Sequence, residues 1–199
     1  MATNKTLTEF KTALSGGGAR PNLFEVAITI PTAAQTAIGS QIDSKFTLLC
    51  KAANLPASNI ANIDVPFRGR IFKVAGDRTY DTWSITVIND TDFVIRTFME
   101  SWMQHIGQYK DASGVTNPDQ YMANATVSQL TRNASNMTAT AGGGITAVKE
   151  YQFEDIFPTN ISAIDLSFDS SDAIEEFTVE FQVNYWYPIA GKTNPATAP

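Results

Sequence analysis

Residues 175–187 read EEFTVEFQVNYWY, and this stretch alternates apolar and polar side chains more regularly than any other part of the chain. Apolar residues at every second position place one face of a β-strand against a core. The positions predicted to share that face are Phe177, Val179, Phe181, Val183, Tyr185 and Tyr187. A single strand of about twelve residues would extend ~40 Å, so we expect it to cross the whole molecule.

Several further segments alternate in the same way and predict strands. They are residues 23–30, 45–52, 79–90, 119–130, 145–157 and 160–168. In residues 45–52 the predicted buried face carries Phe46, Leu48, Cys50 and Ala52, so Cys50 is expected to be a small buried residue. Residues 54–66 contain prolines and predict a connection, whereas residues 65–78 predict one arm of a hairpin that turns near Gly76 and Asp77.

One helix of substantial length is predicted, over residues 91–106. Its apolar stripe consists of Ile95, Phe98, Met99, Trp102 and Ile106. Asp90 or Thr91 is the expected N-cap, and Gly107 is expected to end the helix. Strands without a regular βαβ order predict a mainly β protein, an antiparallel sandwich or barrel with this helix on its flank.

No compositional shift divides the chain, so we expect a single domain over residues 1–199. Residues 1–19 are expected to form an N-terminal arm with a short amphipathic helix, and residues 188–199 a flexible C-terminal tail. Residues 31–44 show neither helical nor strand periodicity and predict a long exposed loop. Neither a signal peptide nor a membrane segment is evident, which predicts a soluble, unexported chain with no membrane insertion.

Catalytic chemistry finds little support in the sequence. The chain has one histidine, His105, and one cysteine, Cys50, so a nucleophilic triad would have to use His105 and a cysteine-based zinc site is excluded. The glycine-rich stretches lack the pattern of a phosphate-binding loop. We therefore expect no enzyme activity, no cofactor and no metal.

Positive charge gathers in VPFRGRIFKVAGDR, residues 65–78, although the net charge of the chain is -6. The cluster is open to two interpretations, a nucleic-acid site or ion pairs within and between subunits. Aspartates interleave with the basic residues, which favours ion pairing. The candidate intersubunit contact residues are Arg68, Arg70, Lys73, Asp77 and Arg78.

FRGRIFKVAGDRTYDTWSITVIND, residues 67–90, resembles the tail tube proteins of contractile-tailed, T-even-like bacteriophages. So do ARPNLFEV at residues 19–26, LCKAANLPAS at 49–58 and IEEFTVEFQVNYW at 174–186. The resemblance covers most of the chain in the same order. It implies a tail tube fold whose subunits form hexameric rings, with strands of six copies closing a continuous inner barrel.

The same resemblance implies partners and a location. Rings would stack into a tube inside the sheath, with baseplate and tail terminator proteins at its ends, and viral DNA would pass through the lumen without specific binding. The protein would lie in the virion tail after assembly in the host cytoplasm. A type VI secretion-like tube, a tube-initiating baseplate protein, a carbohydrate-binding β-sandwich module and a DNA-binding module remain as alternatives.

Electrostatics makes the implied conduit plausible, since a ring of six copies would carry 6 × (-6) = -36 charges. A neutral or acidic lumen repels phosphate, whereas each added cation would increase the affinity for DNA. The polar strand faces provide the lumen-lining candidates, which are Glu150, Gln152, Glu154, Asn124, Thr126 and Ser128. Residues 1–19 and 31–44 are expected to become ordered on stacking, and deletion of residues 31–44 is expected to block polymerisation.

Overall fold

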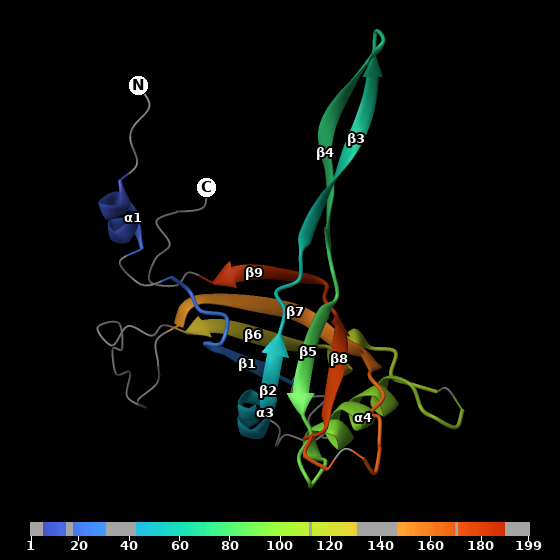
Figure 1. Ribbon diagram of the computed structural model, residues 1–199. Coiled ribbons are helices and arrows are strands. Elements are labelled where there is room, and N and C mark those ends of the chain that lie inside the picture. The colour runs from blue at the N-terminus through green and yellow to red at the C-terminus, as the bar shows by residue number, and fades with distance from the viewer. Residues whose placement is uncertain are drawn as a thin grey trace.

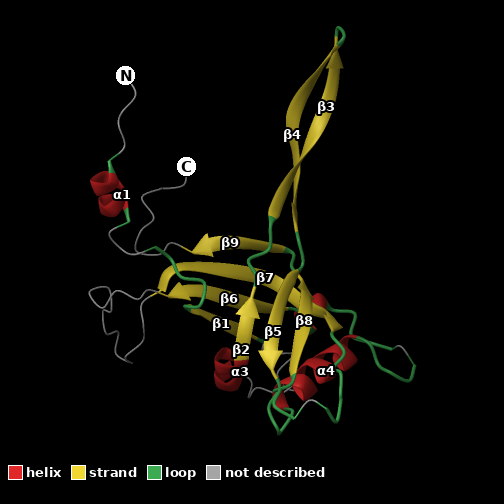
Figure 2. Cartoon of the chain, in the orientation of Figure 1, coloured by secondary structure: helices red, strands yellow, loops and turns green. Residues whose placement is uncertain are grey.

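Strands are the main secondary structure of the described chain, and Figure 2 shows them in two crossed layers from which a long hairpin projects. The computed structural model describes residues 6–14, 18–30, 43–111, 113–130, 147–169 and 171–189. Its strands are β1 Phe24–Thr29, β2 Cys50–Ala53, β3 Ser58–Phe67, β4 Arg70–Tyr80, β5 Trp83–Ile88, β6 Ala123–Leu130, β7 Ala147–Ile161, β8 Glu176–Gln182 and β9 Tyr185–Ile189. Its helices are α1 Leu7–Ala13, α3 Asp43–Leu49, α4 Val94–Ile106 and the 3₁₀ turn η1 Pro118–Gln120.

The long strand β7 joins the two layers, because it changes partners along its length. Its first part lies between β6 and β9, and its last residues pair with β8. One layer therefore has the order β1-β6-β7-β9, and the other has the order β7-β8-β5-β2. Figure 1 shows the strands of one layer crossing those of the other steeply. The strand pairings in the described residues are antiparallel, which confirms the predicted fold class.

The core lies between these layers, and Trp83 occupies its centre. Its indole ring stacks on Phe153 of the other layer with 4.8 Å between centroids, and lies 5.3 Å from the ring of Phe181. The indole Nε1 donates to the carbonyl of Asn54 at 3.0 Å, so the buried N–H has a partner. The largest fully buried side chains are Trp83, Trp102, Phe46, Phe153, Phe177, Phe181, Ile28, Ile85, Met99, Ile156 and Val26.

Helix α4 covers one side of the core with the predicted stripe. Ile95, Phe98, Met99 and Trp102 are buried, and the Trp102 ring lies 6.0 Å from that of Phe181 in β8. The predicted N-cap at Asp90 or Thr91 is wrong. The residue before the helix is Phe93, which has a φ of 53° and makes no capping hydrogen bond, while Asp90 binds Lys45 at 3.0 Å.

The strand predicted over residues 45–52 is mostly helix α3, and β2 begins only at Cys50. Phe46 and Cys50 are buried, whereas Leu48 is 82% exposed. Phe46 and Cys50 are four residues apart, so their burial fits one face of a helix as well as one face of a strand. The short run could not distinguish the two periods.

The run that alternates most regularly, residues 175–187, is two strands rather than one. The strand breaks at Val183 and Asn184, after which β9 leaves β8 and pairs with the first part of β7. The break reverses the facing of the later residues: Trp186 is opposite Phe153 and partly buried, whereas Tyr185 and Tyr187 are exposed. The prediction of one strand across the whole molecule is therefore wrong.

The hairpin turns at Arg68 and Gly69, not at Gly76 and Asp77 as the sequence predicts. Both turn residues have positive φ, 46° and 81°, as a tight two-residue turn between strands requires. Gly76 lies within β4, where a Cβ would come 3.1 Å from the Ala61 carbonyl oxygen. A side chain here would be crowded, so glycine favours the close approach of the two strands beside the register shift between Ile60 and Asn62.

Two further predictions fail at the ends of strands. Residues 54–66, expected to be a connection, contain most of β3, because Pro66 sits near the end of a strand that pairs on one side only. Residues 160–168, expected to be a strand, leave β7 after Ile161 and continue as a loop. Leu166 and Phe168 in that loop are exposed, so their alternation does not reflect a buried face.

The described part of the N-terminal arm is the short helix α1. Thr6 and Glu9 form a reciprocal capping box at its start, and Leu7, Phe10 and Leu14 stay exposed. Of the predicted loop 31–44, residues 31–42 lie outside the described residues and the last two begin α3. In the described part of the chain, no helix is long and apolar enough to cross a membrane.

Candidate functional site

Metal-ligating side chains and the single cysteine are the first candidates for a reactive site. Within the described residues, no group of three His, Cys, Asp or Glu side chains could hold a metal ion. Cys50 is buried, and burial raises the pKa of its thiol to about 11, which keeps it protonated and unreactive at neutral pH. The chemically distinctive features are instead two surfaces, a polar sheet face and the projecting hairpin.

The outer face of the layer β1-β6-β7-β9 is the first surface, and we call it the polar face. All six lumen-lining candidates lie on it, in register across β6 and β7: Thr126 is opposite Gln152, and Ser128 is opposite Glu150. The remaining two, Asn124 and Glu154, lie further along the same strands. The sequence did not show that these six residues lie close together, because the order of strands in a sheet depends on contacts between segments that are far apart in the chain.

The outer strands extend the polar face on both sides. In β1, Glu25, Ala27 and Thr29 are exposed, and Glu25 is opposite Ser128. In β9, Tyr187 is opposite Gln152 and Tyr185 is opposite Glu154. Glu25, Glu150 and Glu154 are therefore three carboxylates on a face whose strand positions hold no Lys or Arg. Lys149 lies on the other side of β7, with its Nζ 5.9 Å from the Tyr151 ring centroid.

Hydrogen bonds connect neighbouring strands on the polar face. The Thr126 hydroxyl donates to the Gln152 side-chain oxygen at 2.9 Å, and the Tyr187 hydroxyl donates to the Glu154 carboxylate at 3.0 Å. The hydrogen bond to Glu154 raises the pKa of Tyr187 above its ordinary value. The rings of Tyr185 and Tyr187 stack with centroids 6.3 Å apart. The face is thus acidic, with its polar groups partly engaged with each other.

Within the described residues neither edge of this layer pairs with a further strand, although the Val26 carbonyl of β1 accepts a hydrogen bond from the Thr47 hydroxyl of α3 at 3.1 Å. Strand β1 pairs only with β6, and β9 pairs only with β7, among the strands that the structure describes. An open edge presents unpaired backbone N–H and C=O groups to which another strand can add. The layer can therefore be extended by a further strand on either side.

The hairpin of β3 and β4 is the second surface, and its two strands pair only with each other. Figure 1 shows it extending away from both layers. One of its faces is apolar and exposed, with the cross-strand pairs Ile63–Val74 and Val65–Phe72 and, beside the turn, Phe67. An exposed apolar surface of this kind, without a partner in the described residues, is typical of a contact site for another chain.

The predicted intersubunit contact residues divide into two groups. Lys73 pairs with Asp64 across the hairpin at 3.0 Å, so its charge is used within the chain. Arg68, Arg70 and Arg78 have no carboxylate partner within the described residues, and the Arg68 guanidinium lies 5.5 Å from the Phe67 ring centroid. Asp77 is on β4 and likewise forms no ion pair in the described part of the chain.

Sequence reasoning missed Glu25, Tyr185 and Tyr187 as members of the polar face. The alternation of residues 23–30 already places Glu25 opposite the buried residues, so its exposure could have been read from the pattern. The two tyrosines could not be found this way, because the break at Val183 and Asn184 reverses their facing.

Known proteins resemble the chain over almost its whole length. The family described as phage tail tube protein matches residues 19–188. Tail tube protein gp19 of Enterobacteria phage T4 is 35% identical over 173 residues, which are 86% of this chain and 93% of that protein. The residues matched by the family include both the polar face and the hairpin.

Solved structures share the fold at much lower sequence identity. A chain of the anti-feeding prophage baseplate, a six-fold symmetrised structure, has a TM-score of 0.61 and 10% identity, covering 88% of this chain and 97% of that chain. A chain of the PVC sheath-tube complex of an extracellular contractile injection system has a TM-score of 0.53 and 12% identity, covering 94% of this chain and 99% of that chain. At these identities the likeness establishes the fold alone.

Proposed function

Because the chain belongs to the family of phage tail tube proteins, we propose that six copies close into a ring and that such rings stack into the inner tube of a contractile tail. The role is structural, and the protein is a component of the virion tail. The tube serves as the conduit through which the genome reaches the host.

The observation that carries the proposal is the layer β1-β6-β7-β9 with an open edge on each side. Neighbouring strands are antiparallel throughout, so β1 and β9 run in opposite directions. When β9 of one copy lies beside β1 of the next copy, the antiparallel order therefore continues without interruption. Closure into a ring pairs every such edge, which removes the exposed backbone groups that promote aggregation.

The polar face becomes the wall of the lumen in this ring. Its three carboxylates per copy, Glu25, Glu150 and Glu154, face the passing DNA, and its strand positions contribute no cation. Phosphate is repelled from such a wall, so the DNA moves without specific binding. The layer's other face packs on the core, which leaves the second layer and α4 on the outside of the ring.

Stacking of rings uses the hairpin, since its apolar face has no partner within the described chain. The sheath surrounds the outer side, and baseplate and tail terminator proteins contact the two ends of the stack. A chain of similar fold occurs in a sheath-tube complex and another in a six-fold symmetrised baseplate, which supports both the partners and the ring size. Assembly takes place in the host cytoplasm, before the virion is released.

Ring closure is tested by crosslinking the two edges of the polar face. The variant carries Ala27→Cys and Tyr187→Cys, and Glu25→Cys or Thr29→Cys replaces Ala27→Cys in parallel variants to cover other registers. A bis-maleimide reagent should produce a ladder on a denaturing gel that ends at six chains. Each single substitution serves as the matched control, and the buried Cys50 contributes little background.

A ladder that continues beyond six chains, or no interchain product with any of the three pairs, would contradict the closed six-membered ring. Circular dichroism of each variant establishes that the subunit is folded before the crosslinking result is read.

A further inference from the structure

We propose that the hairpin tip of one copy docks into a pocket at the opposite end of a copy in the next ring. The pocket lies in the connection between β7 and β8 and is lined by residues 163–168 and 173–176. Figure 1 shows the hairpin tip and this connection at opposite ends of the subunit. The contact specifies the receiving surface for the stacking proposed above and rests on that proposal.

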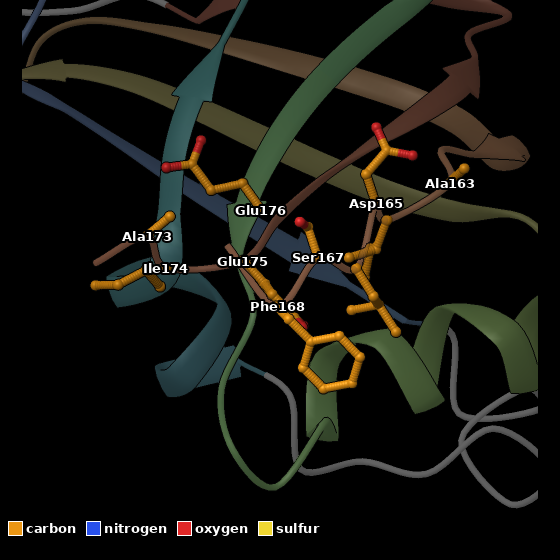
Figure 3. Close-up of a pocket in the computed structure, with 10 residues that line it drawn as sticks. Ala163, Asp165, Ser167, Phe168, Ala173, Ile174, Glu175 and Glu176 are labelled. Atoms are coloured by element: carbon orange, nitrogen blue, oxygen red, sulfur yellow. The ribbon is translucent and has the colours of Figure 1, made fainter. Parts of the chain in front are cut away.

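The pocket combines a cavity with exposed apolar and acidic side chains. Its volume is about 630 Å³, which exceeds that of any single side chain. Leu166, Phe168 and Ile174 are all strongly exposed, at 80%, 108% and 72%. Figure 3 shows Asp165 and Phe168 on one arm of the connection and Ile174 on the other. We call this site the loop pocket.

The loop pocket is held in place at both ends of the connection. At the start, the Arg96 guanidinium donates to the Ser162 carbonyl at 3.2 Å, and Ser162 N donates to the Thr178 carbonyl at 2.8 Å. At the end, Asn89 donates to Glu175 through both its backbone and its side chain, at 2.8 and 2.9 Å. These hydrogen bonds hold both ends of the connection in place before a partner binds, so less conformational entropy is lost when the pocket is filled.

The hairpin tip matches the loop pocket in both polarity and charge. Phe67 and Phe72 lie on its apolar face and are each 66% exposed, and Arg70 is opposite Phe67 on the same face. Arg68 and Arg70 have no carboxylate within the described chain, and Asp165 and Asp169 have no cation there. Docking buries the aromatic rings in the cavity and brings these opposite charges together.

Charge complementarity favours the hairpin tip over helix α1, which also exposes apolar side chains. Its apolar residues Leu7, Phe10 and Leu14 accompany one acidic and one basic residue, Glu9 and Lys11, so the helix carries no net positive charge toward the acidic pocket. The hairpin tip instead carries two arginines and no acid between Phe67 and Phe72. The hairpin of a second copy is therefore the occupant.

Position-specific crosslinking tests the contact in the full-length chain. A variant with both Arg70→Cys and Asp165→Cys is treated with a bis-maleimide reagent in concentrated solution. Because the hairpin of one copy meets the pocket of another, the expected product is a ladder that continues past six chains. The matched control carries Lys11→Cys and Asp165→Cys, which should give no ladder.

Charge exchange provides a second, independent readout. Arg70→Glu and Asp165→Arg should each reduce tube formation about threefold or more relative to the unmodified chain. A single exposed ion pair contributes little free energy, but in the proposed tube the pair recurs at every subunit. The chain with both substitutions should recover tube formation, because the pair is restored with reversed signs. Asp119→Lys, an exposed charge reversal outside the pocket, should leave tube formation unchanged.

Three results would overturn the docking contact. The variant with Arg70→Cys and Asp165→Cys gives no crosslinked product, the control with Lys11→Cys and Asp165→Cys gives the ladder instead, or Asp165→Arg forms tubes normally. Rings that close at six chains without this head-to-tail product would overturn the docking contact alone. A head-to-tail ladder without any ring would instead uphold the contact and overturn the proposed ring.

Discussion

At the scale of single residues, Trp83 connects the two layers through its stacking on Phe153 and its hydrogen bond to the Asn54 carbonyl. We predict that Trp83→Ala lowers the free energy of unfolding by about 3–5 kcal/mol, because it leaves a large cavity and an unpartnered carbonyl. Urea denaturation of the monomer measures this loss. Leu48→Ala, at a position 82% exposed, is the control and should cost no more than about 0.5 kcal/mol.

Cys50 is predicted to react slowly in the folded subunit. With a thiol pKa of about 11, only about a thousandth of the groups are ionised at pH 8. A thiol-specific reagent should therefore react about a hundredfold more slowly with the native chain than with the chain in guanidinium chloride. Because the folded pKa is raised, stability should also fall as pH rises from the ordinary thiol pKa toward 11. Equal reaction rates in the two states would refute the burial of this thiol.

At the scale of elements, the polar face is expected to set the speed of DNA passage. We predict that virions built with Glu150→Lys and Glu154→Lys eject DNA more slowly, because every ring then presents twelve cations in place of twelve carboxylates, two in each of the six copies proposed. Time-resolved ejection measures the rate. The control, Asp119→Lys, changes charge outside this face, and unchanged ejection in the double variant would count against a lumenal position.

The hairpin is expected to contribute to assembly and not to the stability of the subunit. Replacing residues 65–72 by Asn-Gly keeps the Asp64–Lys73 pair beside a tight turn and removes the aromatic tip. We predict an unfolding free energy within about 0.5 kcal/mol of the unmodified chain, because the removed residues pack on nothing else in the described subunit. Rings should still form but should not stack. Tubes of ordinary length from this variant would contradict the role of the hairpin.

Local patterns predicted the elements whose contacts are local. The stripe of α4 and the alternation of β5, β6 and the first part of β7 could be read from the sequence, and with them all six candidates on the polar face. The position of the hairpin turn could not, since Gly69 and Gly76 are equally permissive and only the pairing with β3 shows that Gly76 serves close approach.

At the scale of the whole molecule, the arrangement depends on contacts that no single segment encodes. Residues 175–187 alternate more regularly than any other run, yet β9 leaves β8 and pairs instead with the first part of β7. That turn creates the four-stranded layer and exposes Tyr185 and Tyr187. The loop pocket could not be predicted from the sequence either, because the alternation of residues 160–168 indicated a strand with a buried face.

The two strand edges and the hairpin with its loop pocket lie on different sides of the subunit, and the proposed tube uses each for a different contact. In the proposed tube, the edges of β1 and β9 join copies within a ring, whereas the hairpin and the loop pocket, which lie at opposite ends of the subunit, join one ring to the next. A subunit with both contacts builds a closed ring first in one direction and an open stack in the other.

Electron microscopy of the purified, concentrated protein tests the ring most directly. Class averages of negatively stained particles should show six-fold rings with a central channel, seen end-on, and tubes of stacked rings, seen from the side. Particles that remain monomeric at every concentration, or that form rings with another number of subunits, would contradict the account.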